Sequence, residues 1–147
     1  LAELCGEWSS TEGEADRVAG RPVTPRGLHE AWDACIANRN GFWRASVYEN
    51  EAGVVEGYMM SSGHHALNIV GPAVAVNDGV AAALLLRELD FYRGRTPLFI
   101  LPTDHGELIQ QAYSWGARNV ELHVCQVRGT FQPFQGVVMP TFLLETA

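Results

Sequence analysis

The chain has no lysine. All 10 of its basic residues are arginine, and 17 acidic residues give the chain a formal net charge of −7. The absence of lysine excludes a lysine nucleophile and a lysine Schiff base. Binding to nucleic acid requires clustered Lys and Arg against the phosphates, so the negative charge predicts no nucleic-acid partner. A cationic ligand suits this charge better than an anionic one.

Cysteine is scarce as well. The 3 copies, Cys5, Cys35 and Cys125, are far apart, and none belongs to a C-x-x-C or Cys/His cluster with the spacing of zinc ligands. We therefore expect reduced thiols and no metal. No apolar run reaches the ~18 residues that a membrane span requires, and the acidic N-terminal stretch lacks the apolar region of a signal peptide. A cytoplasmic protein with no membrane partner is the resulting expectation.

The length of 147 residues suits one domain. Residues 1–20 mix acidic side chains with Ser and Gly, which predicts a poorly ordered or loosely attached segment. We expect a single domain over residues 21–147. It begins with a helix over residues 24–40, where apolar side chains recur at helical spacing and Asn40-Gly41 ends the pattern.

The rest of the domain alternates strands with helices. Periodicity and turn residues predict strands at residues 42–49, 54–62, 66–76, 96–102, 119–127 and 136–145, and helices at 77–95 and 106–116. Three hairpin-linked strands followed by strand–helix–strand connections imply a central mixed sheet flanked by helices, an α/β fold of the α+β kind. Gly71-Pro72 falls inside the third strand. Because proline cannot donate to the ladder, that strand is expected to bulge or splay there.

The order of these elements, together with two local patterns, resembles the GCN5-related N-acetyltransferase (GNAT) family over roughly residues 27–124. The first pattern is Val76-Asn77-Asp78-Gly79-Val80-Ala81, where the long helix begins. GNAT proteins bind acetyl-CoA at this place through a Q/R-x-x-G-x-G/A turn. The Gly and Ala match that turn, whereas Val76 stands where the family has Gln or Arg.

The second pattern is the later helix, which resembles a GNAT helix that carries a tyrosine shortly before a glycine. Tyr113 stands at the family tyrosine, which lies near the thioester sulfur and commonly serves as general acid. His105 replaces the family's asparagine, and Ala117 replaces its usual phenylalanine. A tyrosine at helical spacing after Leu108 and Ile109 can also be a packing residue, which is the alternative.

The resemblance implies acetyl-CoA as a co-substrate. Its pyrophosphate would lie on the backbone N–H groups at the start of the long helix, and its pantetheine arm would pair with the preceding strand, in the gap opened by Gly71-Pro72. Cofactor contacts are therefore expected at Ala73, Val74, Val76, Asn77, Asp78, Gly79, Val80, Ala81 and His105. The Asp78 carboxylate would repel the pyrophosphate, so an ordinary core helix capped by Asn77 or Asp78 is the alternative.

The base that would accept the amine proton is expected among the histidines of the turn before the third strand and an acidic residue on the second. Adjacent side chains of a strand face opposite ways, so at most one of His64 and His65 faces a cleft. His65 and Glu56 are the candidates, and histidine has the unperturbed pKa that suits accepting an ammonium proton near neutrality. Two solvated turn histidines are the alternative.

These residues support two interpretations. The first is an acyl-CoA-dependent N-acyltransferase, a transferase that moves an acetyl group from acetyl-CoA to an amine of a small molecule or a protein. The second is a catalytically inactive GNAT-like domain that serves as a dimerisation or ligand-sensing module, either in a homodimer or beside a second GNAT-like domain. Gly79, Ala81 and Tyr113 favour the enzyme, whereas Val76 and Asp78 favour the inactive domain.

Overall fold

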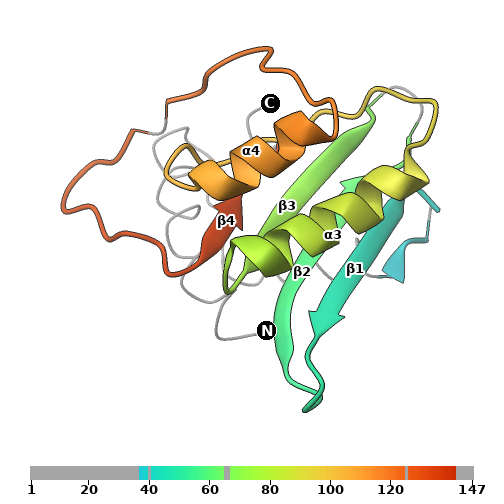
Figure 1. Cartoon of the computed structure of the whole chain (residues 1–147), viewed down its shortest axis with the longest axis horizontal. Coiled ribbons are helices and arrows are strands. Elements are labelled where there is room, and N and C mark those ends of the chain that lie inside the picture. The colour runs from blue at the N-terminus through green and yellow to red at the C-terminus, as the bar shows by residue number, and fades with distance from the viewer. Residues whose placement is uncertain (1–36, 40, 65–66, 125, 142–147) are drawn as a thin grey trace. The chain divides into compact units, whose positions relative to one another are not determined.

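The computed structural model describes residues 37–39, 41–64, 67–124 and 126–141. The elements, in chain order, are β1 (Trp43–Glu49), β2 (Val55–Ser62), β3 (Ile69–Ala75), α3 (Asp78–Phe91), α4 (Gly106–Ser114) and β4 (Val137–Met139) (Figure 1). The chain divides into two compact units, residues 1–44 and 45–147, and β2, β3, β4 and both helices belong to the second. The segment 1–20 and nearly all of the predicted helix over 24–40 lie outside the described residues.

The sheet has the strand order β1-β2-β3-β4, and β3 pairs antiparallel with β2 and with β4. Strands β1, β2 and β3 confirm the predictions for residues 42–49, 54–62 and 66–76. The predicted α+β class is therefore confirmed. The described sheet is antiparallel, however, where the sequence predicts a mixed one.

The predicted break in β3 is present as a β-bulge. The register between β2 and β3 shifts between Met59 and Ser61, so that Gly71-Pro72 lies opposite a single residue of β2. Because side chains alternate along a strand, the extra residue returns Val70 to the face that carries Ala73. Both side chains belong to the hydrophobic core. The bulge thus allows β3 to present one continuous apolar face.

Two segments pair with the edge of β3 that faces away from β2. At its beginning, Leu98 forms an isolated parallel bridge with Ile69, and the Leu98 carbonyl accepts the Val70 N–H at 2.8 Å. At its end, residues Ala73–Ala75 pair with β4. The predicted strand over 96–102 does not form beyond this single bridge, because β4 takes the part of the edge that it would need. The prediction for that strand is wrong.

Both predicted C-terminal strands also differ from the structure. The described residues of the predicted strand over 119–127 form no strand and are exposed. The predicted strand over 136–145 is shortened to β4, and its residues after Thr141 lie outside the described ones. Pro140, which lacks an N–H donor, directly follows β4 and cannot extend its ladder.

Helix α3 begins where its sequence predicts and ends at Phe91, before the predicted end at residue 95. The side chain of Asn77 is the N-cap and accepts the Val80 N–H at 3.0 Å, so Asn77, and not Asp78, caps this helix. At the other end the chain turns through Gly94, which has a φ of 77°. The hydroxyl of Tyr92 donates to the Ser62 carbonyl at 2.6 Å and ties the end of the helix to β2.

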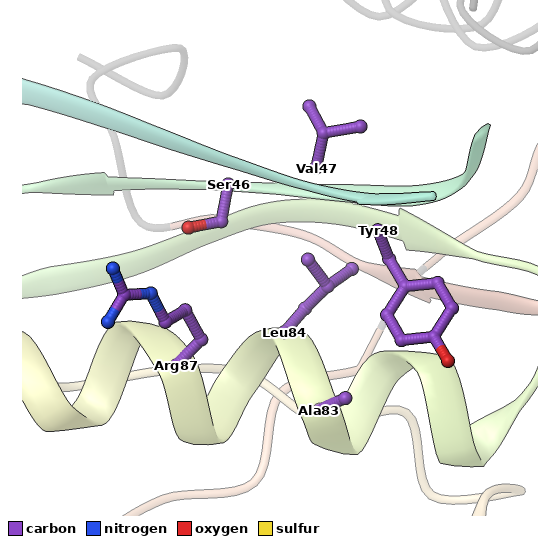
Figure 2. A pocket seen from close by; sticks show the side chains of 6 residues that line it. All are labelled: Ser46, Val47, Tyr48, Ala83, Leu84 and Arg87. Carbon is purple, nitrogen blue, oxygen red and sulfur yellow. The ribbon is translucent and has the colours of Figure 1, made fainter. Parts of the chain in front are cut away.

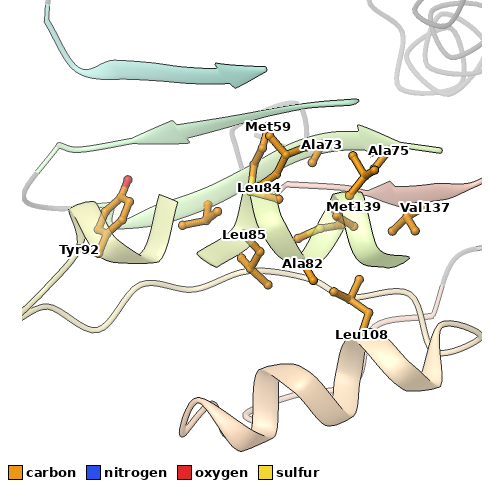
Figure 3. Packing of buried hydrophobic residues seen from close by; sticks show 13 residues of the cluster. Met59, Ala73, Ala75, Ala82, Leu84, Leu85, Tyr92, Leu108, Val137 and Met139 are labelled. Carbon is orange, nitrogen blue, oxygen red and sulfur yellow. The ribbon is translucent and has the colours of Figure 1, made fainter. Parts of the chain in front are cut away.

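The core is one apolar layer between the sheet and the helices. Both α3 and α4 lie on the same side of the sheet, and α4 also packs against α3 (Figure 3). The side chains of the cluster are Met59, Val70, Ala73, Ala75, Val80, Ala81, Ala82, Leu84, Leu85, Tyr92, Leu108, Val137 and Met139. β4 and α4 therefore contribute to the same core as the long helix.

Gly136→Ala tests whether β4 holds this edge of β3. Gly136 has a φ of 77°, and an added Cβ would overlap the Ala75 carbonyl oxygen. Gly53 is a matched control, since its φ is 78° and an added Cβ would meet only Glu49 Oε1 at 3.6 Å. We expect Gly53→Ala to cost about 1–2 kcal/mol of unfolding free energy, from the left-handed backbone alone, and Gly136→Ala to cost roughly 3 kcal/mol or more. Urea denaturation measures both, and equal costs would contradict the pairing of β4 with β3.

Candidate functional site

An aspartate and a histidine join the beginnings of α3 and α4. His105 Nδ1 lies 2.6 Å from Asp78 Oδ1, and the Leu108 N–H donates to Asp78 Oδ2 at 3.3 Å. A carboxylate oxygen only accepts, so Nδ1 carries the proton and donates it. His105 is the N-cap residue of α4 but its side chain makes no capping hydrogen bond. Asp78, the first residue of α3, caps α4 instead.

This pair lies beside the place at which the CoA pyrophosphate is expected, the start of α3. The side chains of His105 and Asp78 are 21% and 25% exposed, so the carboxylate is largely enclosed at the start of both helices. A helix N-terminus favours one nearby anion, and here that anion is Asp78. Sequence reasoning placed both residues among the cofactor contacts, and the structure brings them together as partners of each other.

The remaining residues of the Gly/Ala pattern have structural roles in α3. The side chains of Val80 and Ala81 are buried in the core. The first-turn N–H groups of these two residues donate to Asn77, one to its side chain and one to its carbonyl. At Gly79, an added Cβ would lie 3.3 Å from Asn77 Oδ1, which is tighter than ordinary contact. The glycine is therefore explained by the cap as well as by a phosphate.

The backbone expected to bind pantetheine is already paired. Residues Ala73–Ala75, including Val74, pair with β2 on one side and with β4 on the other. The Val76 N–H donates to the Glu56 carbonyl at 2.9 Å. The chain itself therefore pairs with residues 73–75 on both sides of the strand, and the contact of residues 73–76 with pantetheine stays a prediction.

Two of the three predicted catalytic residues, Tyr113 and Glu56, lie among the described residues, on α4 and on β2. Tyr113 lies in the last turn of α4, before Gly116 with its φ of 97°, as predicted, and its side chain is 45% exposed. It is at the opposite end of the helix from His105, about 12 Å away at ~1.5 Å per residue. The carboxylate of Glu56 on β2 accepts a hydrogen bond from the Asn50 side chain at 2.7 Å, beside the β1–β2 turn. His65 lies outside the described residues.

Sequence reasoning missed a buried carboxylate on α3. Glu88 is fully buried, and its carboxylate accepts the hydroxyl of Ser61 at 2.5 Å and the hydroxyl of Ser46. Such hydrogen bonds offset part of the cost of burying a charge. The sequence contains a signal for this burial, because Glu88 follows Leu84 and Leu85 at the spacing of residues on the buried face of the helix.

A shallow groove of about 310 Å³ lies between β1 and α3, above this carboxylate. Ser46, Val47, Tyr48, Ala83, Leu84 and Arg87 line it. Ser46 and Tyr48 point toward α3 and Val47 points away from it, as the alternation of a strand requires (Figure 2). Its volume is at the lower limit for small-molecule sites. None of the predicted cofactor or catalytic residues lines this groove.

The residues within the described ranges have two further properties. No helix there is long and apolar enough to cross a membrane. In the same part of the chain, no group of His, Cys, Asp and Glu side chains is arranged to hold a metal ion.

Asp78→Ala tests the role of this residue as a cap between helices. We expect a loss of roughly 1–3 kcal/mol of unfolding free energy, because the substitution removes the carboxylate that accepts from His105. The same carboxylate accepts the N–H of buried Leu108, which would lose its acceptor as well. Asp104→Ala is the control, since Asp104 is 83% exposed and its carboxylate is 4.0 Å from His105 Nε2. The control should leave the denaturation midpoint nearly unchanged. Equal midpoints for the two variants would rule out the capping role.

Comparison of the chain with protein-family models, with curated proteins and with solved structures found no match. Its function therefore has to be inferred from its own residues and their geometry.

Proposed function

We propose that this chain is a GNAT-like domain that acts as a binding module and does not transfer an acetyl group at the site its sequence pattern suggests. The observation that carries this proposal is the Asp78 carboxylate between the first turns of α3 and α4. It accepts hydrogen bonds from His105 at 2.6 Å and from Leu108 at 3.3 Å. An internal anion thus lies beside the position that an acyl-CoA pyrophosphate would take, which supports the proposal.

The magnitudes favour the internal anion over the external one. A helix N-terminus stabilises an anion by about 0.3–1 kcal/mol in an exposed setting. Two unit charges 4 Å apart repel each other by about 4 kcal/mol at an effective dielectric constant of 20. A pyrophosphate beside Asp78 would therefore lose more to the carboxylate than it gains from the helix.

The pairing of β3 supports the same proposal. Acyl-CoA enzymes of the family hold pantetheine in the gap beside the strand that leads into the long helix, which requires free backbone groups. Here residues Ala73–Ala75 pair with β2 and with β4. Pantetheine would have to displace β4, whose Val137 and Met139 are buried in the core.

An N-acyltransferase is the second candidate, and the place of Tyr113 favours it. A hydroxyl in the last turn of α4, 45% exposed and shortly before a glycine, is accessible to a leaving thiolate. The enzyme would then have to bind acetyl-CoA elsewhere than on the backbone of 73–81.

A thermal-shift titration with acetyl-CoA and with free CoA separates the two candidates. For a binding module that does not bind CoA, we expect no change in melting temperature up to ~1 mM ligand, which is about 100 times a Kd of ~10 μM. An enzyme that binds with this affinity would gain about 2.7 kcal/mol, a rise of roughly 5 °C or more. Such a rise would overturn the proposal.

If Asp78→Asn then tightened CoA binding, the pyrophosphate would be located at α3, because the substitution removes the repelling charge.

Tyr113→Phe tests the enzyme hypothesis directly in an acetyl-transfer assay. The substitution deletes one hydroxyl and retains the ring, so an enzyme that uses it as general acid would lose about 10²–10⁴-fold in kcat at an unchanged Tm. We expect instead that wild type and Tyr113→Phe give the same background rate of CoA release. Tyr48→Phe, at another exposed tyrosine, is the matched control. A selective loss of turnover in Tyr113→Phe alone would establish the acyltransferase.

A further inference from the structure

The segment between α4 and β4 exposes an unusual number of apolar side chains. This segment follows the last turn of α4 as a long loop, drawn in orange, and returns to the sheet at β4 (Figure 1). Its apolar side chains are between 51% and 79% exposed: Val120, Leu122, Val124, Val127, Phe131 and Phe134. Apolar side chains gathered in this way on a surface mark a site of association.

The first part of this segment alternates polar and apolar residues. His123 Nε2 lies 3.2 Å from Glu121 Oε1, so these two side chains lie on the same side of the chain. In an extended chain, residues two apart share a face and their neighbours take the other. If residues 120–124 pair as a strand, Val120, Leu122 and Val124 therefore form the opposite, apolar face. No strand is assigned to these residues in the structure, but their sequence and this contact suit one.

The sequence of this strand is complementary to itself when it is reversed. In an antiparallel pair centred on Leu122, Val120 lies opposite Val124, and Glu121 lies opposite His123. Both pairs occur twice because the arrangement has a two-fold axis. The apolar faces of the two strands coincide, and each acidic side chain faces an imidazole that can pair with it.

Neighbouring registers lack this complementarity. A shift by one residue turns the apolar face of one strand to the polar face of the other. A shift by two residues places either Glu121 opposite Glu121, two like charges that destabilise the pair, or His123 opposite His123, which leaves each Glu121 without an imidazole opposite it. Among these registers, the one centred on Leu122 alone pairs unlike groups on the polar face and apolar groups on the other.

We propose that residues 120–124 are a dimerisation strand, which pairs antiparallel with the same strand of a second copy of this chain. The inference deepens the proposed function, since it names the surface and the partner through which a binding module of this kind would act. The partner is a second copy because the pattern of charges and apolar side chains is complementary to its own reverse.

Sedimentation velocity of the full chain, at 0.15 M salt and from about 1 to 200 μM, tests this dimer. Salt at this concentration limits the repulsion between two acidic subunits, since the Debye length is about 8 Å. We expect a concentration-dependent dimer for the wild type. Leu122→Asp, which brings two carboxylates together at the two-fold axis, should leave only monomer. Val127→Asp introduces the same charge at an exposed position outside the strand and should leave the dimer intact.

A charge exchange tests the register. His123→Glu sets two carboxylates opposite each other at both pairs and should raise the dimer Kd about tenfold or more. The double variant Glu121→His/His123→Glu restores unlike pairs in the register centred on Leu122, so it should return the Kd to within about threefold of the wild type. If His123→Glu weakened the dimer only by lowering the solubility of the chain, the double variant would not recover the Kd of the wild type. Circular dichroism of each variant checks that the monomer fold is retained.

A wild-type chain that stays monomeric at 200 μM overturns the dimer, as does a dimer that tolerates Leu122→Asp. Either result leaves the proposed function standing if CoA still gives no thermal shift. Conversely, CoA binding with an intact dimer overturns the proposed function and leaves the dimerisation strand in place. The two failures are therefore distinguishable.

Discussion

The carboxylate of Asp78 connects the beginnings of α3 and α4, and the position of the shorter helix depends on it. Helix α4 has 9 residues, fewer than an isolated helix needs for stability in water. Its own N-cap residue gives no side-chain capping bond, so the N–H of Leu108 relies on Asp78. With this contact made, Leu108 enters the core beneath α3 (Figure 3). One side chain of α3 thus helps to place the whole of α4.

The same contact also satisfies a backbone group that a ligand could otherwise meet. Asp78 accepts the N–H of Leu108 in the first turn of α4, and β4 pairs with residues Ala73–Ala75 of β3. Groups that are bonded within the domain in this way are not free for a ligand, and the proposal of a module that does not bind CoA rests on them.

How far the sequence predicts this structure depends on how local each signal is. Strands β1 to β3, the bulge at Gly71-Pro72, the Asn77 cap and helix α4 follow from residues close to one another in the chain. The failure of the strand over 96–102 has a distant cause, because β4 competes with it for the edge of β3. Likewise, the Asp78–His105 pair joins residues 27 positions apart. Both residues were identified, yet nothing local indicates that they bind each other.

Edge competition also explains why residues 120–124 have the pattern of a strand and are not part of the sheet. An edge of β3 accepts one neighbour at each position, and Leu98 and β4 occupy it along its length. The side chains of Val120, Leu122 and Val124 are exposed, whereas proteins usually cover or interrupt a strand sequence of this kind. The segment here contains neither proline nor a run of like charges from Val120 to Val124. The alternation of Glu121 and His123 with apolar residues is the feature on which the proposed pairing with a second copy rests.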